Sequence, residues 1–307
     1  MRKQVEGYLY LSLAMVLVGS TVVASKVIAS GLPPFTATAL RFAIALPFFL
    51  VLMRLTASRW PKLARRDWGL LFLQAAAGSV GYTTLLISGL RCTSAAHAGV
   101  IIGTLPIVSA AIAILVLGER PRRSLLLGIG LAAAGVLAIT VRSGEGGDWF
   151  GNVLILAAVV CEGLFILLNK RLRTDISPLV LSSIMTMIGL ATAAVAACLE
   201  VPWAITMTTG AVWAVIYYAL VPTVGGFLFW YAGAARVSGA EASLFTALAP
   251  VSALFLAALL LSEPVGPVEM FGVGCVLAAV LATGLSGFFQ ARRRMRATRP
   301  DMSSQTR

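Results

Sequence analysis

The sequence predicts an all-α membrane protein with ten transmembrane helices arranged as two inverted five-helix repeats. Three observations carry this prediction: a composition too apolar for a water-soluble protein, ten hydrophobic segments of spanning length, and residues that recur at a constant spacing. Of the 307 residues, 59% are hydrophobic and 12% are charged, and the mean hydropathy is +0.93. An ordinary soluble domain carries about 25% charged residues. The composition therefore excludes a soluble globule, and it equally excludes a disordered or collagen-like chain.

Ten segments are apolar and long enough to cross a bilayer. A hydrocarbon core about 30 Å thick takes roughly 20 residues of α-helix, and a helix satisfies its own backbone hydrogen bonds where lipid offers no partner. We therefore expect ten helices joined by short loops. In order, they are residues 7–29, 34–53, 68–89, 94–117, 124–141, 150–169, 177–199, 211–232, 239–261 and 265–287.

The distribution of basic residues predicts the orientation of these helices. A net charge of +12 would suggest a nucleic-acid partner in a soluble protein, but here the charges follow the membrane crossings. Of the 24 Lys and Arg residues, 20 fall in the termini and loops of one side, whereas Arg91 and Arg142 fall in loops of the other. Cytoplasmic loops carry such an excess. Both termini are therefore predicted to be cytoplasmic, no nucleic-acid partner is expected, and the basic tail, residues 291–307, is predicted to be disordered and to contact anionic lipid.

An internal repeat organises the chain into residues 1–145 and residues 146–290, each with five predicted helices. Because five is odd, the second repeat enters the membrane from the opposite side and is inverted. Inverted repeats are typical of secondary transporters, in which two similar halves open a midplane site to either face in turn. Pairs 144 positions apart are Gly7 and Gly151, Gly19 and Gly163, Lys26 and Lys170, Pro34 and Pro178, Pro106 and Pro250, Glu119 and Glu263, Gly128 and Gly272, and Gly130 and Gly274; Trp68 and Trp213, and Arg91 and Arg236, are 145 apart.

Many of these residues also resemble the EamA repeat of the drug/metabolite transporter superfamily. The resemblance occurs twice in register and covers nearly all of the chain to about residue 287. Two positions depart from the pattern: Val18, where many members carry Trp, and Ser262, which replaces a Gly. The matching residues are Gly19, Ser20, Lys26, Gly31, Leu32, Pro33, Pro34, Arg41, Phe42, Leu105, Pro106, Leu117, Gly118 and Glu119 in the first repeat, and Ala249, Pro250, Leu261 and Glu263 in the second.

The resemblance implies a secondary transporter of a bacterial inner membrane that works by alternating access without a cofactor. Within the superfamily the chain is similar to ten-helix bacterial exporters of amino acids, including aromatic ones. Export of small amphipathic metabolites, amino acids among them, is therefore the expected function. The expected partners are a small-molecule substrate and membrane lipid, and a monomer is favoured. The resemblance also implies a central cavity lined by the first, third, fourth, sixth, eighth and ninth helices.

Other functions fit the sequence less well. Export or import of other small metabolites or of drugs would use the same architecture. A channel would keep a continuous polar stripe, which the sequence lacks. An intramembrane enzyme would carry a pattern such as HExxH, GxSxG or paired aspartates, and the sequence contains none. No enzymatic activity is therefore expected, and four cysteines without CxxC spacing give no indication of a metal site.

Ionisable residues within the apolar segments are candidates for the substrate site, because a charge in hydrocarbon is costly and usually faces an interior cavity. Glu162 lies in the middle of the sixth predicted helix, with Asn169 seven residues further along the same face. We expect Glu162 to bind a substrate ammonium group or a proton, or else to pair with a helix hydroxyl. Lys26 and Arg41 lie nearer the outer side, where they would attract a substrate carboxylate or snorkel to the interface.

His97 and Glu241 form a further pair of candidates for substrate binding, 144 positions apart. They occupy equivalent positions at the starts of the fourth and ninth predicted helices. A helix N-terminus stabilises a carboxylate such as that of Glu241. A structural role for this pair is therefore the alternative.

Aromatic residues beside glycines predict a pocket for a flat or apolar side chain. Tyr82 lies deep in the third predicted helix, close to Gly78 and Gly81, and Trp230 and Tyr231 follow a pair of glycines in the eighth. The same glycines would also permit close helix packing. Both interpretations stay open from the sequence.

Pro106 and Pro250 lie within the fourth and ninth predicted helices at matching positions of the two repeats. A proline removes one intrahelical hydrogen bond and clashes with the preceding turn, so each is expected to kink or unwind its helix. Their symmetry favours a hinge, and a packing kink satisfied by neighbouring helices is the alternative.

The charge distribution gives a direct test of topology. A reporter that is active only in the cytoplasm should be active when it is fused after residue 307 and when it is fused before residue 1. A reporter that is active only in the periplasm should be inactive at both places. Periplasmic activity of the C-terminal fusion would contradict both the topology and the inverted repeat.

Overall fold

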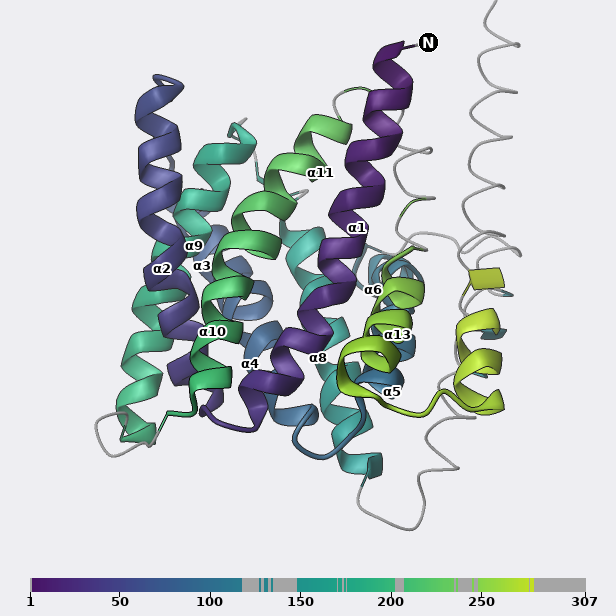
Figure 1. Cartoon of the computed structure of the whole chain (residues 1–307). Helices are drawn as coiled ribbons and strands as arrows, with labels where there is room; N and C mark the ends of the chain where they lie inside the picture. The colour runs from purple at the N-terminus through teal and green to yellow at the C-terminus, as the bar shows by residue number, and fades with distance from the viewer. Residues whose placement is uncertain are drawn as a thin grey trace, which may run out of the picture.

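The structure is a computed structural model, and it describes residues 2–117, 127, 130–131, 134, 148–169, 171–172, 174, 176–201, 207–234, 236, 245, 248–275 and 277–278. All regular elements within these residues are helices, which run up and down a single bundle (Figure 1). No strand occurs in this part of the chain. The all-helical prediction is therefore confirmed for the described residues.

Six runs of helix in the described residues are long and apolar enough to cross a membrane. They match the first three and the sixth to eighth predicted segments. The predicted segment 124–141 and much of 265–287 lie outside the described residues, so the count of ten helices stays a prediction. The six are Val5–Ala29, Pro34–Leu55, Arg65–Gly89, Trp149–Leu168, Pro178–Glu200 and Thr209–Trp230.

Fourteen helical elements have defined bounds in the described residues. In chain order they are α1 (Arg2–Ala29), α2 (Pro34–Leu55), α3 (Arg65–Gln74), η1 (Ala75–Tyr82), α4 (Thr83–Gly89), α5 (Ala95–Ile102), α6 (Leu105–Leu117), α8 (Asp148–Asn169), α9 (Pro178–Ala197), η2 (Cys198–Glu200), α10 (Thr209–Tyr218), η4 (Ala219–Gly225), α11 (Gly226–Ala234) and α13 (Leu248–Leu261).

Two spans contain a π-helical middle section. In one, η1 separates α3 from α4, and in the other, η4 separates α10 from α11. The two sections occupy corresponding places in the two repeats, because the repeat spacing of 144 to 145 residues carries one onto the other. A π-helix is rare and concentrates at functional sites. The sequence prediction treated both spans as regular helices.

The fourth predicted helix is interrupted rather than merely bent. It ends as α5 at Ile102 and begins again as α6 at Leu105, with Gly103 and Thr104 forming a turn between them. Pro106 is the second residue of α6, so its missing N–H removes no hydrogen bond within α6 itself. Pro250 is the third residue of α13 and is buried.

Carboxylates from the second half of the chain cap the N-termini of two helices in the first half. The first backbone amides of a helix have no partner within the helix. Glu200 accepts hydrogen bonds from the amides of Phe35 and Thr36 at the start of α2, at 3.1 and 2.7 Å. Glu263 accepts from the amides of Ala95 and Ala96 at the start of α5, at 3.0 and 2.9 Å. Both helix ends are therefore satisfied without water.

Glycines let the long helices approach at backbone distance, and the contacts recur in both repeats. A Cβ added at Gly89 of α4 would lie 2.9 Å from the carbonyl oxygen of Gly151 in α8. The residues 144 positions away repeat this contact, because a Cβ at Gly233 of α11 would lie 3.0 Å from the carbonyl oxygen of Gly7 in α1. Glycine at each position is thus required by packing.

A third close approach joins α1 to α13 through Gly19. A Cβ on Gly19 would lie 2.8 Å from both the carbonyl oxygen of Ala249 and the amide nitrogen of Ala253. Gly163, the repeat equivalent of Gly19, packs on α6, where a Cβ would lie 2.8 Å from the side chain of Ile112 rather than against backbone atoms.

Gly19→Ala should lower the stability of the folded protein by about 1–3 kcal/mol, because backbone atoms of α13 cannot move aside as a flexible side chain can. Gly226→Ala is the matched control, since no atom lies within 4 Å of a Cβ there. Thermal unfolding of the detergent-purified variants measures the difference. Equal midpoints for the two variants would contradict the packing described for Gly19.

Candidate functional site

The guanidinium group of Arg41 is the centre of a polar cluster inside the bundle. Its Nη1 atom donates a hydrogen bond to Thr83 Oγ1 at 3.0 Å. The guanidinium carbon lies 4.5 Å from the ring centroid of Phe42 and 4.4 Å from that of Tyr218. Cation–π contacts of this kind are strongest where water is excluded, and Tyr218 is only 4% exposed. Arg41 is thus held between aromatic rings on helices α2 and α10.

Glu162 on α8 supplies the opposite charge. Its carboxylate interacts electrostatically with Arg41 and with the hydroxyl group of Tyr82. Neither charge is isolated, which matters because an unpaired charge inside a membrane protein is costly. The Nε atom of Arg41 is nevertheless buried without a hydrogen-bond partner among the described residues. The cluster therefore retains a free donor within electrostatic reach of the Glu162 carboxylate.

Side chains of α1 extend the polar surface of this cluster. The hydroxyl group of Tyr217 donates to Ser20 Oγ at 2.8 Å, and Thr21 lies within hydrogen-bonding reach of Tyr82. Four helical segments, α1, α2, α8 and α10, therefore contribute to the cluster together with the junction of η1 and α4. In the bundle, α4 contacts α1, α2 and α8, and α10 contacts α1 and α2 (Figure 1).

Both π-helical sections end or begin at this cluster. Tyr82 is the last residue of η1, and Tyr218 directly precedes η4. The extra residue per turn shifts the direction of the side chains that follow, and it leaves carbonyl groups without their usual partners. Thr223 Oγ1 donates to one of these, the carbonyl oxygen of Tyr218, at 2.7 Å. The two tyrosines at the boundaries of the π-helical sections, one from each repeat, interact electrostatically with each other.

Lys26 does not join the Arg41 cluster. Its Nζ atom donates to the carbonyl oxygens of Leu90 and Thr93 at 2.8 and 2.6 Å, just beyond the end of α4. A cation at a helix C-terminus is favourable. Lys26 in this structure therefore closes a helix end and links α1 to the loop that leads into α5.

His97 also lies away from the cluster. Its Nε2 atom is 3.0 Å from Glu269 Oε1, and its Nδ1 atom is 3.5 Å from Thr93 Oγ1. Glu269 in turn accepts a hydrogen bond from the amide of Gly266 at 2.8 Å. The histidine thus ties the start of α5 to the segment that follows α13, next to the cap made by Glu263.

Trp230 lies in an apolar cluster with Val18 and Phe229, packed on Ala14, Met15 and Ala249. Val18 is the repeat equivalent of Glu162, so the two halves place an apolar and a charged residue at matching positions. Of the other candidates, Glu241 and the side chains of Asn169, Tyr231 and Pro106 lie outside the described residues.

Sequence reasoning selected Tyr82 and Glu162 but gave no role to Tyr218, Thr21 or Thr83. The sequence predicts that Arg41 attracts a substrate carboxylate or snorkels to the interface, but it does not indicate that Arg41 contacts Thr83, Phe42 and Tyr218. An arginine seven positions into an apolar helix was the available signal. The tyrosines at 217 and 218 looked like ordinary helix residues because the π-helical section after them leaves no pattern in the sequence.

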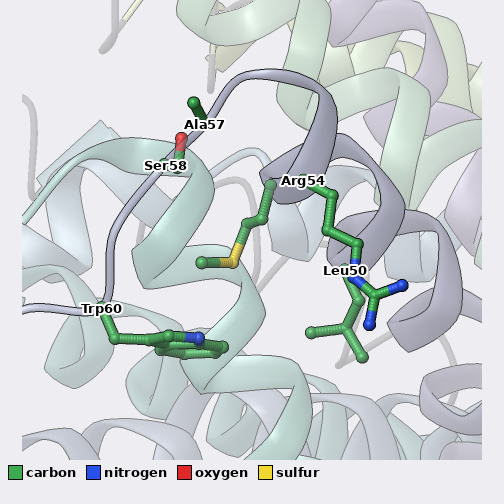
Figure 2. A pocket seen from close by; sticks show the side chains of 6 residues that line it. Leu50, Arg54, Ala57, Ser58 and Trp60 are labelled. Atoms are coloured by element: carbon green, nitrogen blue, oxygen red, sulfur yellow. The ribbon is translucent and has the colours of Figure 1, made fainter.

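A separate pocket lies at the end of α2, away from the Arg41 cluster. It has a volume of about 340 Å³ and is lined by Leu50, Met53, Arg54, Ala57, Ser58 and Trp60 (Figure 2). No group of three or more His, Cys, Asp or Glu side chains within the described residues could hold a metal ion.

Comparison with known proteins relates this chain to a family of transporters. The sequence pattern of the EamA-like transporter family matches residues 5–141 and again residues 149–285. The uncharacterized transporter YetK of Bacillus subtilis is 33% identical over 289 residues, which are 92% of this chain and 88% of that protein. A "probable terminal-alkyne amino-acid exporter" of Streptantibioticus cattleyicolor is 28% identical over 222 residues, 70% of this chain and 73% of that protein.

A solved crystal structure has the same fold, with a TM-score of 0.61 at 20% sequence identity, covering 95% of this chain and 98% of the other. The family pattern spans both halves of the chain, its members are transporters rather than enzymes, and the apolar helices cross the membrane several times. The chain therefore belongs to the EamA-like transporter family and is a multi-pass membrane protein.

Proposed function

We propose that this transporter exports small amphipathic metabolites, amino acids including aromatic ones among them, by alternating access, and that the Arg41 cluster is its substrate site. The observation that carries the proposal is that the Arg41 guanidinium, 4.4 Å from the ring centroid of Tyr218, interacts electrostatically with the Glu162 carboxylate, which also acts on Tyr82. An α-amino acid has the complementary charges. Its carboxylate would accept from the free Nε of Arg41, and its ammonium group would lie against Glu162.

The aromatic side chains suit the rest of such a substrate. Tyr218 and Phe42 already stack on one cation, and a flat or apolar side chain would pack against the same kind of surface. The probable terminal-alkyne amino-acid exporter of Streptantibioticus cattleyicolor, which is 28% identical to this chain over 222 residues, supports this substrate class. An enclosed site of opposite charges favours a transporter over a channel, because a channel must release its ion quickly.

The arrangement of the two halves supports alternating access. α1 and α8 start their repeats, and they run in opposite directions through the bundle (Figure 1). The contacts of Gly89 with Gly151 and of Gly233 with Gly7 are equivalent in the repeats. Each of the two contacts joins the first helix of one repeat to the third helix of the other repeat. Two halves related in this way can exchange their packing and expose one site to either side.

Glu162→Gln should lower transport of a bound amino acid about tenfold or more, because a hydrogen bond to a charged group contributes roughly 1.5–3 kcal/mol. The substitution keeps the shape of the side chain and removes its charge. Uptake into proteoliposomes over a range of external pH measures the effect. Glu6→Gln is the control, since Glu6 is a half-exposed carboxylate 4.0 Å from Arg236, away from the cluster. Unchanged transport with unchanged pH dependence in Glu162→Gln would return the residue to a structural role.

Pro106→Ala and Pro250→Ala should shift the transporter toward opposite facing states. Alanine at position 106 supplies an amide that can donate to the carbonyl of Ile102 and so join α5 to α6 across the turn at Gly103. Pro250 occupies the equivalent place in the other half, and inverted halves exchange roles during the cycle. Labelling of cysteines near each mouth of the bundle with an impermeant reagent, from each side, measures the shift. Parallel shifts, or wild-type labelling and transport in both variants, would identify these prolines as packing features.

A further inference from the structure

The pocket at the end of α2 has no part in the Arg41 cluster, and its construction differs from an ordinary surface depression. α2 ends at Leu55, and the chain turns back on the helix through Ala57, whose φ of 49° is left-handed. The amide of Ala57 donates to Arg54 O at 3.2 Å, and the amide of Ser58 donates to Met53 O at 2.9 Å. These two bonds form the helix-ending motif in which glycine usually holds the left-handed position. Alanine adopts that conformation less readily.

Polar and apolar groups line the same cavity. Arg54 and Trp60 face the cavity from different sides, with Leu50 beside the guanidinium group (Figure 2). Met53 forms the buried wall between them, whereas the side chains of Arg54 and Trp60 are exposed. The pocket therefore presents a cation and an indole N–H at its mouth and hydrocarbon along its side.

The charge around the pocket has one sign. Arg54, Arg59, Lys62, Arg65 and Arg66 occur within residues 54–66, and no acidic residue occurs in that range. Arg54 has no carboxylate partner among the described residues. The next acidic residue, Asp67, is 2% exposed and accepts a hydrogen bond from Thr174 at 2.6 Å. Among residues 54–66 and the residues that line the pocket, a negative ligand would therefore meet no opposing carboxylate.

The position of the pocket identifies the ligand. It lies at the last turn of a membrane-spanning helix, at the end of the bundle where the N-terminus lies (Figure 1). Basic clusters next to a membrane span attract anionic lipid, and Trp is enriched at the level of the lipid head groups. A soluble anion such as phosphate has no apolar group that could pack against Leu50 and Met53.

We propose that this pocket binds one anionic phospholipid, with its phosphate on Arg54, its head group under Trp60 and its acyl chain along Leu50 and Met53. The proposal concerns a structural lipid and does not depend on what the transporter carries. A zwitterionic lipid would bind less well, because its own cation would lie close to the Arg54 guanidinium, which lines the pocket.

Native mass spectrometry of the full-length protein, titrated with phosphatidylglycerol or phosphatidylcholine, tests the proposal. Phosphatidylglycerol should be retained in preference, and Arg54→Gln should weaken its binding about tenfold, the loss expected for one charge-assisted contact. Arg59→Gln is the matched control, because Arg59 is equally exposed and does not line the pocket. Equal retention of the two lipids, or an equal loss in both variants, would overturn the proposal.

A second measurement does not depend on Arg54. Brominated phosphatidylglycerol in vesicles should quench the fluorescence of the wild-type protein more than that of Trp60→Phe, and brominated phosphatidylcholine should give a smaller difference. Inorganic phosphate serves as the soluble-anion probe. If phosphate displaced phosphatidylglycerol at equal concentration, the site would be an anion site without lipid specificity, and the proposal would be wrong.

Discussion

The fold depends on one constraint: the ends and breaks of helices inside a membrane protein must find partners that lipid does not supply. The chain meets it with charged side chains from distant segments. Glu200 closes the start of α2, Glu263 closes the start of α5, and Lys26 closes the end of α4. Each of these bonds also joins helices that are far apart in sequence. These charged groups therefore remove the cost of leaving helix ends without hydrogen bonds, and they also hold the bundle together. A charged residue in an apolar segment can in this way have a structural role.

Much of the fold was predictable because membrane spans follow from length and apolarity alone. The helix bounds at Ala29 and Pro34 agree with the sequence prediction to the residue, and α9 begins at Pro178, one residue after the predicted start at 177. Proline at a first helical position is a strong local signal. The interruption at Gly103 and Thr104 was foreseen as a kink at Pro106, and it falls just before that proline. The two π-helical sections were not foreseen, because they arise from packing between helices and from Pro222, which lies inside η4.

The candidate site shows a similar division. Glu162 could be selected from sequence because a carboxylate in mid-helix has few explanations, and Tyr82 could be selected because small residues surround it. What the sequence could not indicate was which charge faces which. Arg41 and Lys26 are both cations near the outer ends of their helices, yet Arg41 donates to Thr83 and interacts electrostatically with Glu162, whereas Lys26 donates to backbone carbonyls. The direction in which a charged side chain points is decided by its neighbours on other helices. A single sequence does not show which residues those neighbours are.

The capping of early helices by late residues has a consequence for how the protein is made. A chain enters the membrane in order from its N-terminus, and domains of such proteins generally form during synthesis. Here α2 and α5 enter first, but Glu200 and Glu263 leave the ribosome some 160 residues after the amides they bind. Until then those amides must be covered by water or by the insertion machinery. Assembly of the first half is thus completed only by the second, and a truncated message would yield a fragment with open helix ends for quality control to recognise.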